Sequence, residues 1–421
     1  MKNPILAMIP SGYNAADAKL YSILPVDGSG DFTVSVDADA TRINKEGLIE
    51  GVALNQARLT YDPLNPECPS LLLEPTVTNL QVYSQEFDNV AWLKVQSTIT
   101  ANNTISPSGE LNADKLQRTA TSSSYVLDII SKSTDAKTYT TSVFVKQGEG
   151  DFFAMRAQGT YPSRVDLRFQ FSTKQIIQYV ASSSFTALSS NVEELKNGWF
   201  RISMTYTTDS HSALINYFSS RSSNGDTDDT DINPNANCFL WGCQVEENSY
   251  VTSYIPTVNS VTTRTRDLCT EAGNIDLFNV SKLSLFVDAN NFKRNTGSLS
   301  YIVLTDGQSS PINMIRIEYR QDRIVVIVYD NGIDKLGYNI ISVIPNQRNK
   351  LLLTFDNNEV KIYFNGVLRN ISTSVPIPSG LDSLSFTNRT ENAYNFQGEV
   401  HDARVYDRVL TETEAIKLTT I

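Results

Sequence analysis

Residues 239–247 read FLWGCQVEE, and residues 250–257 continue with YVTSYIPT. Apolar and polar side chains alternate through the first stretch, which is the pattern of a strand with one buried face. Proline has no backbone N–H for a sheet ladder, so Pro256 marks where strand pairing stops. We therefore expect this stretch to be the closing strand of a β-sandwich.

The same alternation occurs upstream, in residues 139–146, 164–171 and 199–206. A period of two over seven or eight residues means that one face packs inward and the other meets solvent. Asn197-Gly198 is a preferred two-residue hairpin turn. These runs predict an antiparallel sandwich and leave its strand order open.

Composition limits the classes of protein to be considered. The 421 residues suffice for two sandwiches, and 19 Tyr and 18 Phe favour strands. A net charge of -11 argues against binding to nucleic acid. No apolar run reaches the roughly 18 residues of a membrane span, and the first ten residues are too short and proline-broken for a secretory leader. We expect synthesis in a host cytoplasm, no membrane insertion and free, mostly buried cysteines.

Residues 1–70 differ from the rest. Proline and glycine punctuate short β segments such as 32–36 and 48–52, which cannot bury a core alone. We interpret residues 1–70 as an extended arm that docks on another subunit or on a larger particle.

The closing stretch, with its W-G-x-Q-x-E and T-S-Y-I-P-T elements, resembles the end of a jelly-roll domain found in phage structural and fibre proteins. The opening is similar as well, with CPSLLLEP at 68–75, YSQEFD at 83–88 and Trp92. Residues 40–50, ATRINKEGLIE, resemble the element that precedes this sandwich in phage proteins. The resemblance implies a carbohydrate-binding-module-like jelly roll over residues 71–267.

Residues 268–421 carry different landmarks. Strand patterns at 323–329, 349–355 and 359–366 precede an ending, residues 396–416, that resembles the concanavalin A-like (laminin G-like) sandwich. Within it, Thr411 and Glu414 form a capping-box pattern that predicts one short helix. The fold class we predict is all-β, an extended N-terminal arm followed by two antiparallel sandwiches.

Catalytic constellations are scarce in the sequence. His211 and His401 fall in different predicted domains, which argues against a hydrolase triad. Some concanavalin A-like proteins are glycoside hydrolases with paired strand-borne carboxylates. The nearest pairs here, Glu318 with Asp322 and Glu391 with Glu399, lack that spacing and are interpreted as solvated strand-edge charges. We therefore predict no catalytic residues and no enzyme.

The run NGDTDDTD at 224–231 is the best metal candidate. Asp226, Asp228, Asp229 and Asp231 offer the hard oxygens that calcium prefers, although the run lacks an EF-hand register. A solvated acidic loop is the competing interpretation. No other cofactor is expected.

A sugar site needs an aromatic platform beside planar polar groups. Tyr161, Tyr217, Tyr319 and Tyr394 lie near predicted loops with such neighbours and are our carbohydrate-binding candidates. Tyrosines of this kind also occur in the core or rim of a sandwich.

Two functions remain. The first is a phage virion protein on the particle exterior, a head or tail fibre or decoration subunit. It would form a homotrimer or homodimer, contact other virion proteins through residues 1–70 and adhere to host surface glycans. The alternative is a secreted or surface glycan-binding protein or polysaccharide depolymerase.

Overall fold

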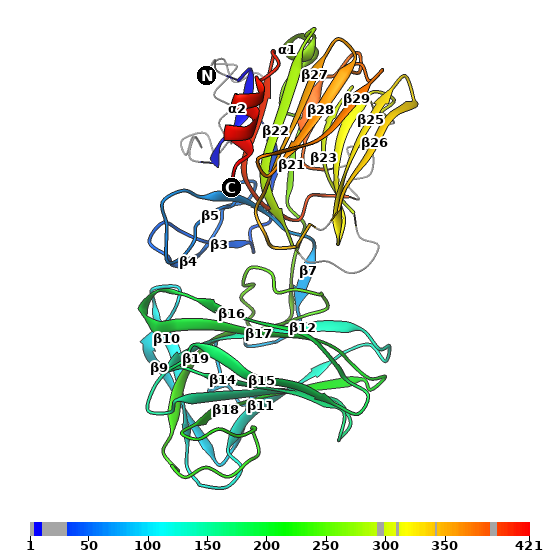
Figure 1. Ribbon diagram of the computed structural model, residues 1–421. Coiled ribbons are helices and arrows are strands. Elements are labelled where there is room, and N and C mark those ends of the chain that lie inside the picture. Colours follow the sequence, from blue (N-terminus) through cyan, green and yellow to red (C-terminus); the bar gives the residue numbers. More distant parts are fainter. Residues whose placement is uncertain (1–3, 11–31, 293–298, 309–310, 342, 388–393) are drawn as a thin grey trace.

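The computed structural model describes residues 4–10, 32–292, 299–308, 311–341, 343–387 and 394–421. Two β-sandwiches are stacked one above the other and joined by a narrow waist (Figure 1). Strands dominate, and every strand pair is antiparallel apart from one isolated bridge, so the all-β antiparallel class is confirmed. No helix in the described ranges is long and apolar enough to cross a membrane.

The lower body in Figure 1, the middle sandwich, consists of two six-stranded sheets. The proximal sheet, which faces the other sandwich, runs in the order β16 (Thr186–Glu194), β17 (Trp199–Thr207), β12 (Thr138–Gln147), β19 (Asn237–Glu246), β10 (Leu111–Arg118) and β9 (Ser97–Ile105). The distal sheet runs in the order β15 (Gln175–Ser182), β14 (Arg164–Gln170), β13 (Phe152–Gln158), β18 (Ala213–Arg221), β11 (Tyr125–Ser131) and β8 (Leu93–Val95).

Alternating side chains from both sheets fill the space between them. Trp92 is fully buried there and packs on Phe87 at 4.7 Å and on Phe218 at 5.8 Å between ring centroids. The turn at Asn197-Gly198 connects β16 to β17, and both residues have positive φ. The strands expected at 139–146, 164–171 and 199–206 are all present.

The closing motif is β19, and its residues clamp the segment that follows. Gly242 has φ +62, and a Cβ there would lie 2.9 Å from the Phe144 ring, so only glycine fits. The Ile255 amide donates to Gln244 Oε1 at 2.7 Å, and the Thr252 amide donates to Glu246 Oε1 at 2.9 Å. The polar positions of W-G-x-Q-x-E therefore fix residues 252–255 against the proximal sheet.

The upper body, the terminal sandwich, is built on a larger sheet. Its order is β29 (Val367–Thr373), β28 (Glu359–Phe364), β27 (Asn349–Asp356), β22 (Leu283–Asn291), β31 (Gly398–Tyr406), β6 (Ser70–Leu73) and β5 (Leu59–Thr60), with β1 (Leu6–Met8) also paired to β31. The facing sheet runs β26 (Ile333–Ile341), β25 (Arg323–Asp330), β24 (Met314–Tyr319), β23 (Ser300–Thr305) and β30 (Ser383–Ser385).

Two helices accompany these sheets. Helix α1 (Ile275–Phe278) is a single turn, and α2 (Glu412–Thr419) lies against the larger sheet near the C-terminus (Figure 1). The Glu414 amide donates to Thr411 Oγ1 at 3.3 Å, and Glu414 accepts from the Thr411 amide at 3.0 Å. The predicted capping box is confirmed.

The described part of residues 1–70 is not a free arm, which corrects our interpretation. β1, β5 and β6 belong to the terminal sheet, and β2 (Thr33–Ser35) pairs with β21 (Leu268–Thr270). β3 (Thr41–Ile43) and β4 (Ile49–Gly51) form a two-stranded ribbon. Short strands that cannot bury a core alone can complete one supplied by the same chain, and Leu59 and Leu71 do so. Residues 1–3 and 11–31 lie outside the described residues.

The waist contains a buried network of ions. Arg58 contacts Glu74 at 2.7 Å and also pairs with Asp267, while Arg264 contacts Glu74 at 2.7 Å. Burial by itself would raise the pKa of Glu74, but the charges of Arg264 and Arg58 lower it to about 2. Beside the network, β7 (Val77–Asn79) pairs with β20 (Thr262–Arg264). The two bodies are thus joined by paired charges and a two-stranded ribbon.

Candidate functional site

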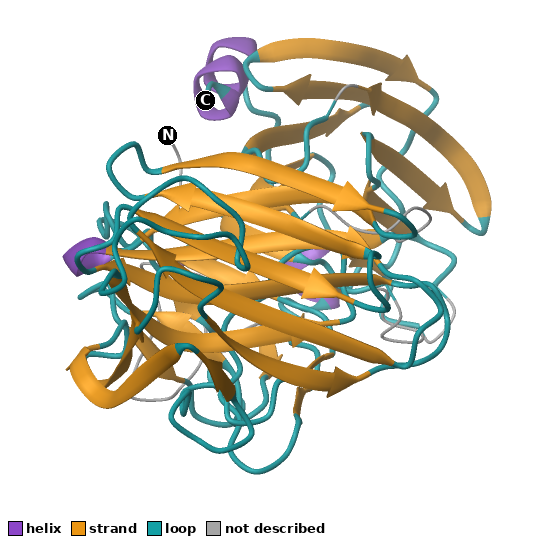
Figure 2. Ribbon diagram, turned by 90° about the horizontal axis from the view of Figure 1, so that it is seen from below, coloured by secondary structure: helices purple, strands orange, loops and turns teal. Residues whose placement is uncertain are grey.

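The outer face of the distal sheet points away from the terminal sandwich and is the side seen in Figure 2. Strand register places Arg156 directly opposite Tyr217 on this face. The ring of Tyr217 meets Tyr125 edge-on at 5.1 Å, and the Arg156 guanidinium lies 5.7 Å above the Tyr217 ring. Gln158 Nε2 donates to the Tyr217 hydroxyl at 3.4 Å. Aromatic and planar polar groups therefore stand side by side here.

A row of charged groups extends this face toward Tyr161. Asp166 accepts from Arg156 Nε and, at 2.7 Å, from Arg164 Nε. The Arg164 guanidinium lies 5.5 Å above the ring of Tyr161, which is 70% exposed. Tyr161 and Tyr217, predicted separately from the sequence, are thus placed on one face. We call Tyr125, Tyr217, Arg156, Arg164 and Tyr161 the distal patch.

The other two tyrosine candidates lie in the terminal sandwich. Tyr319 is only 1% exposed and packs edge-on against Phe396 at 5.1 Å, so it cannot serve as a sugar platform and that prediction was wrong. Side chains of β24 alternate between its two faces, and Tyr319 lies on the face that points into the core. Tyr394 is 37% exposed and packs on Tyr301 at 5.0 Å, and it does not join the distal patch.

The acidic loop folds against the distal patch. Asp228 accepts from both terminal nitrogens of Arg156 at 2.9 Å, and this pairing lowers the pKa of Asp228. Asp226 lies 3.4 Å from Arg168 Nε, Asp229 accepts the Asp226 amide at 2.7 Å, and Asp231 accepts the Ser222 amide at 2.9 Å.

Within the described ranges no group of three or more acidic, Cys or His side chains is arranged to hold a metal ion. The loop carboxylates instead bind arginines and backbone amides, and Asp228 orients Arg156. Calcium binding stays a prediction that competes with these roles.

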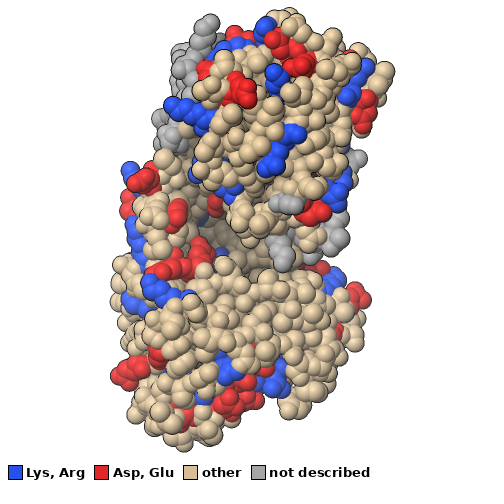
Figure 3. All heavy atoms as spheres, in the orientation of Figure 1, with Lys and Arg blue, Asp and Glu red and all other residues tan. Residues whose placement is uncertain are grey.

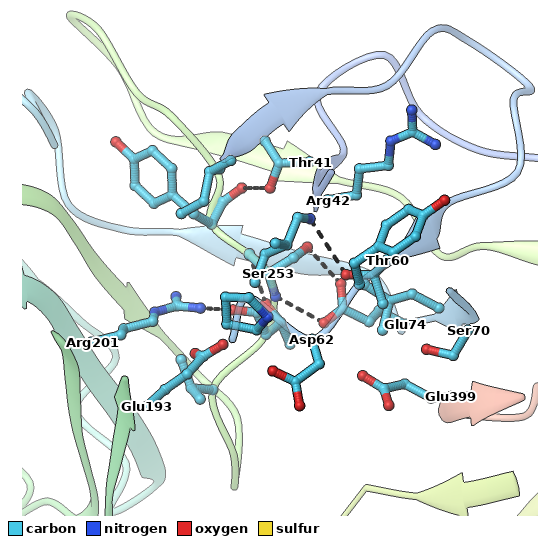
Figure 4. A pocket seen from close by; sticks show the side chains of 18 of the residues that line it. Thr41, Arg42, Thr60, Asp62, Ser70, Glu74, Glu193, Arg201, Ser253 and Glu399 are labelled. Atoms are coloured by element: carbon cyan, nitrogen blue, oxygen red, sulfur yellow. Dashed lines mark hydrogen bonds between the residues drawn. The ribbon is translucent and has the colours of Figure 1, made fainter. Parts of the chain in front are cut away.

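A hollow lies between the two sandwiches (Figure 3). Its volume is about 420 Å³. Three separate parts of the chain contribute one carboxylate each: Asp62 from the loop after β5, Glu193 from β16 and Glu399 from β31. Figure 4 shows these three side chains pointing toward a common space. We call this hollow the acidic cleft.

Burial favours the uncharged form of two carboxyls of the cleft, those of Glu399 and Glu193. Burial, with a contribution from the charge of Glu193, raises the pKa of Glu399 to about 7. Burial also raises the pKa of Glu193, against the attraction of Arg201. Next to them, burial lowers the pKa of His401 to about 4, and Arg348 adds to this effect. His401 Nε2 lies 3.9 Å from Glu399 Oε2, so at neutral pH this contact involves a neutral imidazole.

These positions correct our interpretation of the carboxylates. Glu399 faces the cleft and is not a solvated strand-edge charge. Glu318 is 1% exposed and pairs with Arg320 at 2.6 Å, whereas Asp322 pairs with its neighbour Arg323. Glu391 lies outside the described residues. Sequence reasoning missed Glu193, because no motif connects it to residues that lie far away in the chain.

Comparisons with known proteins agree with the fold of the terminal sandwich. Residues 278–415 match the family model of the concanavalin A-like lectin/glucanases superfamily, as the ending of the sequence predicted. The match covers about a third of the chain. No curated protein sequence matches.

Solved structures match parts of this chain at low identity and low TM-score. The CBM40 domain of Ruminococcus gnavus IT-sialidase bound to α2,3-sialyllactose is 15% identical, with a TM-score of 0.30 over 34% of this chain and 84% of that one. Domain 4 of the arabinanase AbnA from Geobacillus stearothermophilus, in complex with arabinotriose, is 17% identical, with a TM-score of 0.30 over 37% and 73%. A NanB sialidase mutant from Streptococcus pneumoniae is 16% identical, with a TM-score of 0.31 over 35% and 25%.

Proposed function

We propose that this protein adheres to glycans through the distal patch, as a structural subunit on the exterior of a phage particle. The observation that carries the proposal is the joining of the partly exposed side chains of Tyr125, Tyr217 and Gln158 on the outer face of one sheet. The terminal sandwich matches the family model of a lectin and glucanase superfamily, and this match supports the proposal that the chain binds carbohydrate.

The chemistry of the patch suits sugar hydroxyls. A pyranose face stacks on a tyrosine ring, and planar groups such as the Gln158 amide read hydroxyl positions. Arg156 is buried, is held by Asp166 and Asp228 and packs on the Tyr217 ring, so that ring is oriented before a ligand arrives. A preorganised side chain loses less freedom on binding, which strengthens a weak contact.

The placement of the patch suits a particle surface. It lies at the end of the molecule opposite the terminal sandwich (Figure 1). A subunit attached through its terminal sandwich, which includes strands from residues 1–70, would present the patch outward. Several copies on one particle would raise the avidity of weak single sites. The resemblance of residues 40–50 and 68–92 to phage structural proteins supports this assignment, and homo-oligomerisation is part of it.

The proposed activity is binding without turnover. Tyr217→Ala should abolish retention of the protein by host cells and on a glycan array, while Tyr329→Ala on the terminal sandwich should leave retention unchanged. Equal retention of both variants would refute the role of the patch. Release of reducing ends from host polysaccharide would favour a depolymerase.

Location on a particle needs a separate measurement. Immunogold labelling of purified virions should place the protein on the particle exterior. Its absence from particles would favour the alternative of a secreted or surface glycan-binding protein.

A further inference from the structure

One border of the terminal sandwich is formed by the edge strand β26. It is the outermost strand of the five-stranded sheet and lies at the right-hand border of the upper body in Figure 1. Its backbone pairs with β25 on one side, and no backbone hydrogen bond from the described ranges reaches its other side. An edge of this kind presents unpaired N–H and C=O groups that can pair with another strand.

The sequence of this edge lacks the charges that usually protect one. Residues 336–347 contain no Asp, Glu, Lys or Arg, although 19% of the chain is charged. After a register shift at Lys335, residues 336–341 pair without interruption with residues 323–328 of β25. Natural edge strands are normally blunted by charged side chains, bulges or a very short length. Beyond Lys335, β26 has none of these protections.

Other long edge strands of the two sandwiches keep such protection. β29 carries Arg369, β16 ends on Glu193 and Glu194, and β9 is interrupted by two register shifts. β15 is uncharged, but a bulge at Ile177 divides it, and a bulged strand bends away from a partner. β15 is therefore the main competitor of β26 as a pairing edge.

The free edge of β26 is self-complementary about Asn339. An antiparallel pair of two copies with a two-fold axis at Asn339 places each Asn339 opposite the other, and it places Gly337 opposite Ile341 of the second copy. Ile341 is 71% exposed, and a Cβ added to Gly337 would meet only open space. Glycine inside a strand often marks a place where another backbone approaches closely. The exposed isoleucine can therefore cover the bare glycine on both sides of the axis.

Electrostatics favour a second copy as the occupant of this edge. Two copies with a net charge of -11 repel each other, so a contact between them costs least where neither surface is charged. Residues 336–341 provide such a surface. A two-fold contact is also closed, because the same patch is used on both copies and no edge is left for further growth.

We propose that two copies of this chain pair through β26 in antiparallel register, with Asn339 on the two-fold axis. The five-stranded sheets of the two copies then form one continuous sheet, and the backbone groups at the edge find partners. This inference rests on the homo-oligomerisation included in the proposed function. It names the surface and selects a dimer over a trimer.

The test places charge on the axis of the full-length chain. Asn339→Lys and Asn339→Asp each set two like charges directly opposite each other, so each variant alone should raise the dissociation constant of the dimer by at least roughly tenfold. An equimolar mixture of the two variants should restore the dimer, because lysine then faces aspartate. Light scattering over a dilution series measures the dissociation constant. Asn191→Lys, at an exposed position of edge strand β16, is the matched control and should leave the constant unchanged.

A second variant tests the predicted contact between Ile341 and Gly337. Ile341→Ala should weaken the dimer roughly tenfold, because the symmetric contact loses apolar area on both sides of the axis. The side chain is exposed in the single chain, so the fold of the variant should be intact. Circular dichroism and thermal unfolding of each variant check this.

Other outcomes would overturn the inference. A monomer or a trimer of the unmodified chain would exclude two-fold pairing through β26. Failure of the mixed Asn339 variants to restore the dimer would mean that Asn339 does not face its own copy. A dimer weakened by Asn191→Lys as strongly as by Asn339→Lys, or weakened by Val180→Lys on β15 alone, would place the contact elsewhere.

Failure of this inference is distinct from failure of the proposed glycan adhesion. Tyr217 lies on the middle sandwich, whereas β26 belongs to the terminal one. A monomer that host cells retain, with retention lost in Tyr217→Ala, would refute the dimer and leave glycan adhesion standing. A dimer that responds to the Asn339 variants as expected, with retention unaffected by Tyr217→Ala, would refute adhesion through the distal patch alone.

Discussion

Replacing Glu399 by glutamine should change how the free energy of unfolding depends on pH. Folding raises the pKa of this carboxyl from 4.5 to about 7, so the folded state holds a proton that the unfolded state releases between these values. The stabilisation is fully present below pH 4.5 and is lost as the pH rises to 7. At ~1.4 kcal/mol per pH unit this corresponds to about 3.5 kcal/mol, and partial exposure of the side chain lowers the effect to at most about 3 kcal/mol.

His401 changes the free energy of unfolding in the opposite direction over nearly the same pH range. Folding lowers its pKa from 6.5 to about 4, so its contribution is present above pH 6.5 and is lost as the pH falls to 4. The largest contribution of His401 to the free energy of unfolding is again about 3 kcal/mol. In the unmodified chain the two neighbouring residues therefore largely compensate each other between pH 4.5 and 6.5.

Urea unfolding followed by circular dichroism between pH 4.5 and 7 measures the effect. Relative to the unmodified chain, Glu399→Gln should gain stability as the pH rises, by up to about 3 kcal/mol, because the opposing contribution of His401 remains. His401→Asn should show the reverse slope. Parallel curves for all three proteins would refute the argument that burial in the cleft controls these groups.

Four further results are expected. Arg58→Met should destabilise the chain by about 3–5 kcal/mol in urea, because it leaves buried carboxylates short of a cation, whereas Arg42→Met, at a partly exposed pair, should cost under about 1 kcal/mol. Gly242→Ala should lower stability by roughly 1–3 kcal/mol, since φ is positive and Phe144 blocks the new methyl; an unchanged midpoint would contradict this. If the carboxylates of loop 226–231 bind only arginines and backbone amides, chelator should leave the melting temperature unchanged, whereas a drop of several degrees would support the calcium prediction. Light scattering should give an oligomeric mass, and a monomer would refute homo-oligomerisation.

Local patterns in the sequence were sufficient for most strands and for the helix cap. Period-two alternation identified β12, β14 and β17, and the Thr411 and Glu414 spacing identified the start of α2. These features depend on neighbours within a few residues. The same alternation does not say which side of a strand faces the core, because that depends on register. Tyr217 and Tyr319 looked equivalent for this reason, yet Tyr217 is partly exposed and Tyr319 is buried.

Long-range pairings could not be predicted in the same way. Leu71 pairs with Val400, and Glu193 meets Glu399 across the cleft, although no local signal connects these positions. The arm therefore looked free and the cleft was missed. Tyr161, in the turn between β13 and β14, and Tyr217, on β18, belong to one sheet, whereas the cleft depends on the contact of two bodies and could be found only in three dimensions.

The pairing of β6 with β31 has a consequence for how the two bodies are related. Since β1, β5 and β6 precede the middle sandwich in the chain and β22 to β31 follow it, the middle sandwich is a guest inserted into a host domain. Its entry and exit strands, β7 and β20, are hydrogen-bonded neighbours, so a short linker between residues 77 and 264 could replace the guest without disturbing the host sheet. During synthesis the guest is complete before the host has its last strand. The distal patch can therefore be exchanged as a module, while the acidic cleft exists only when guest and host are present together.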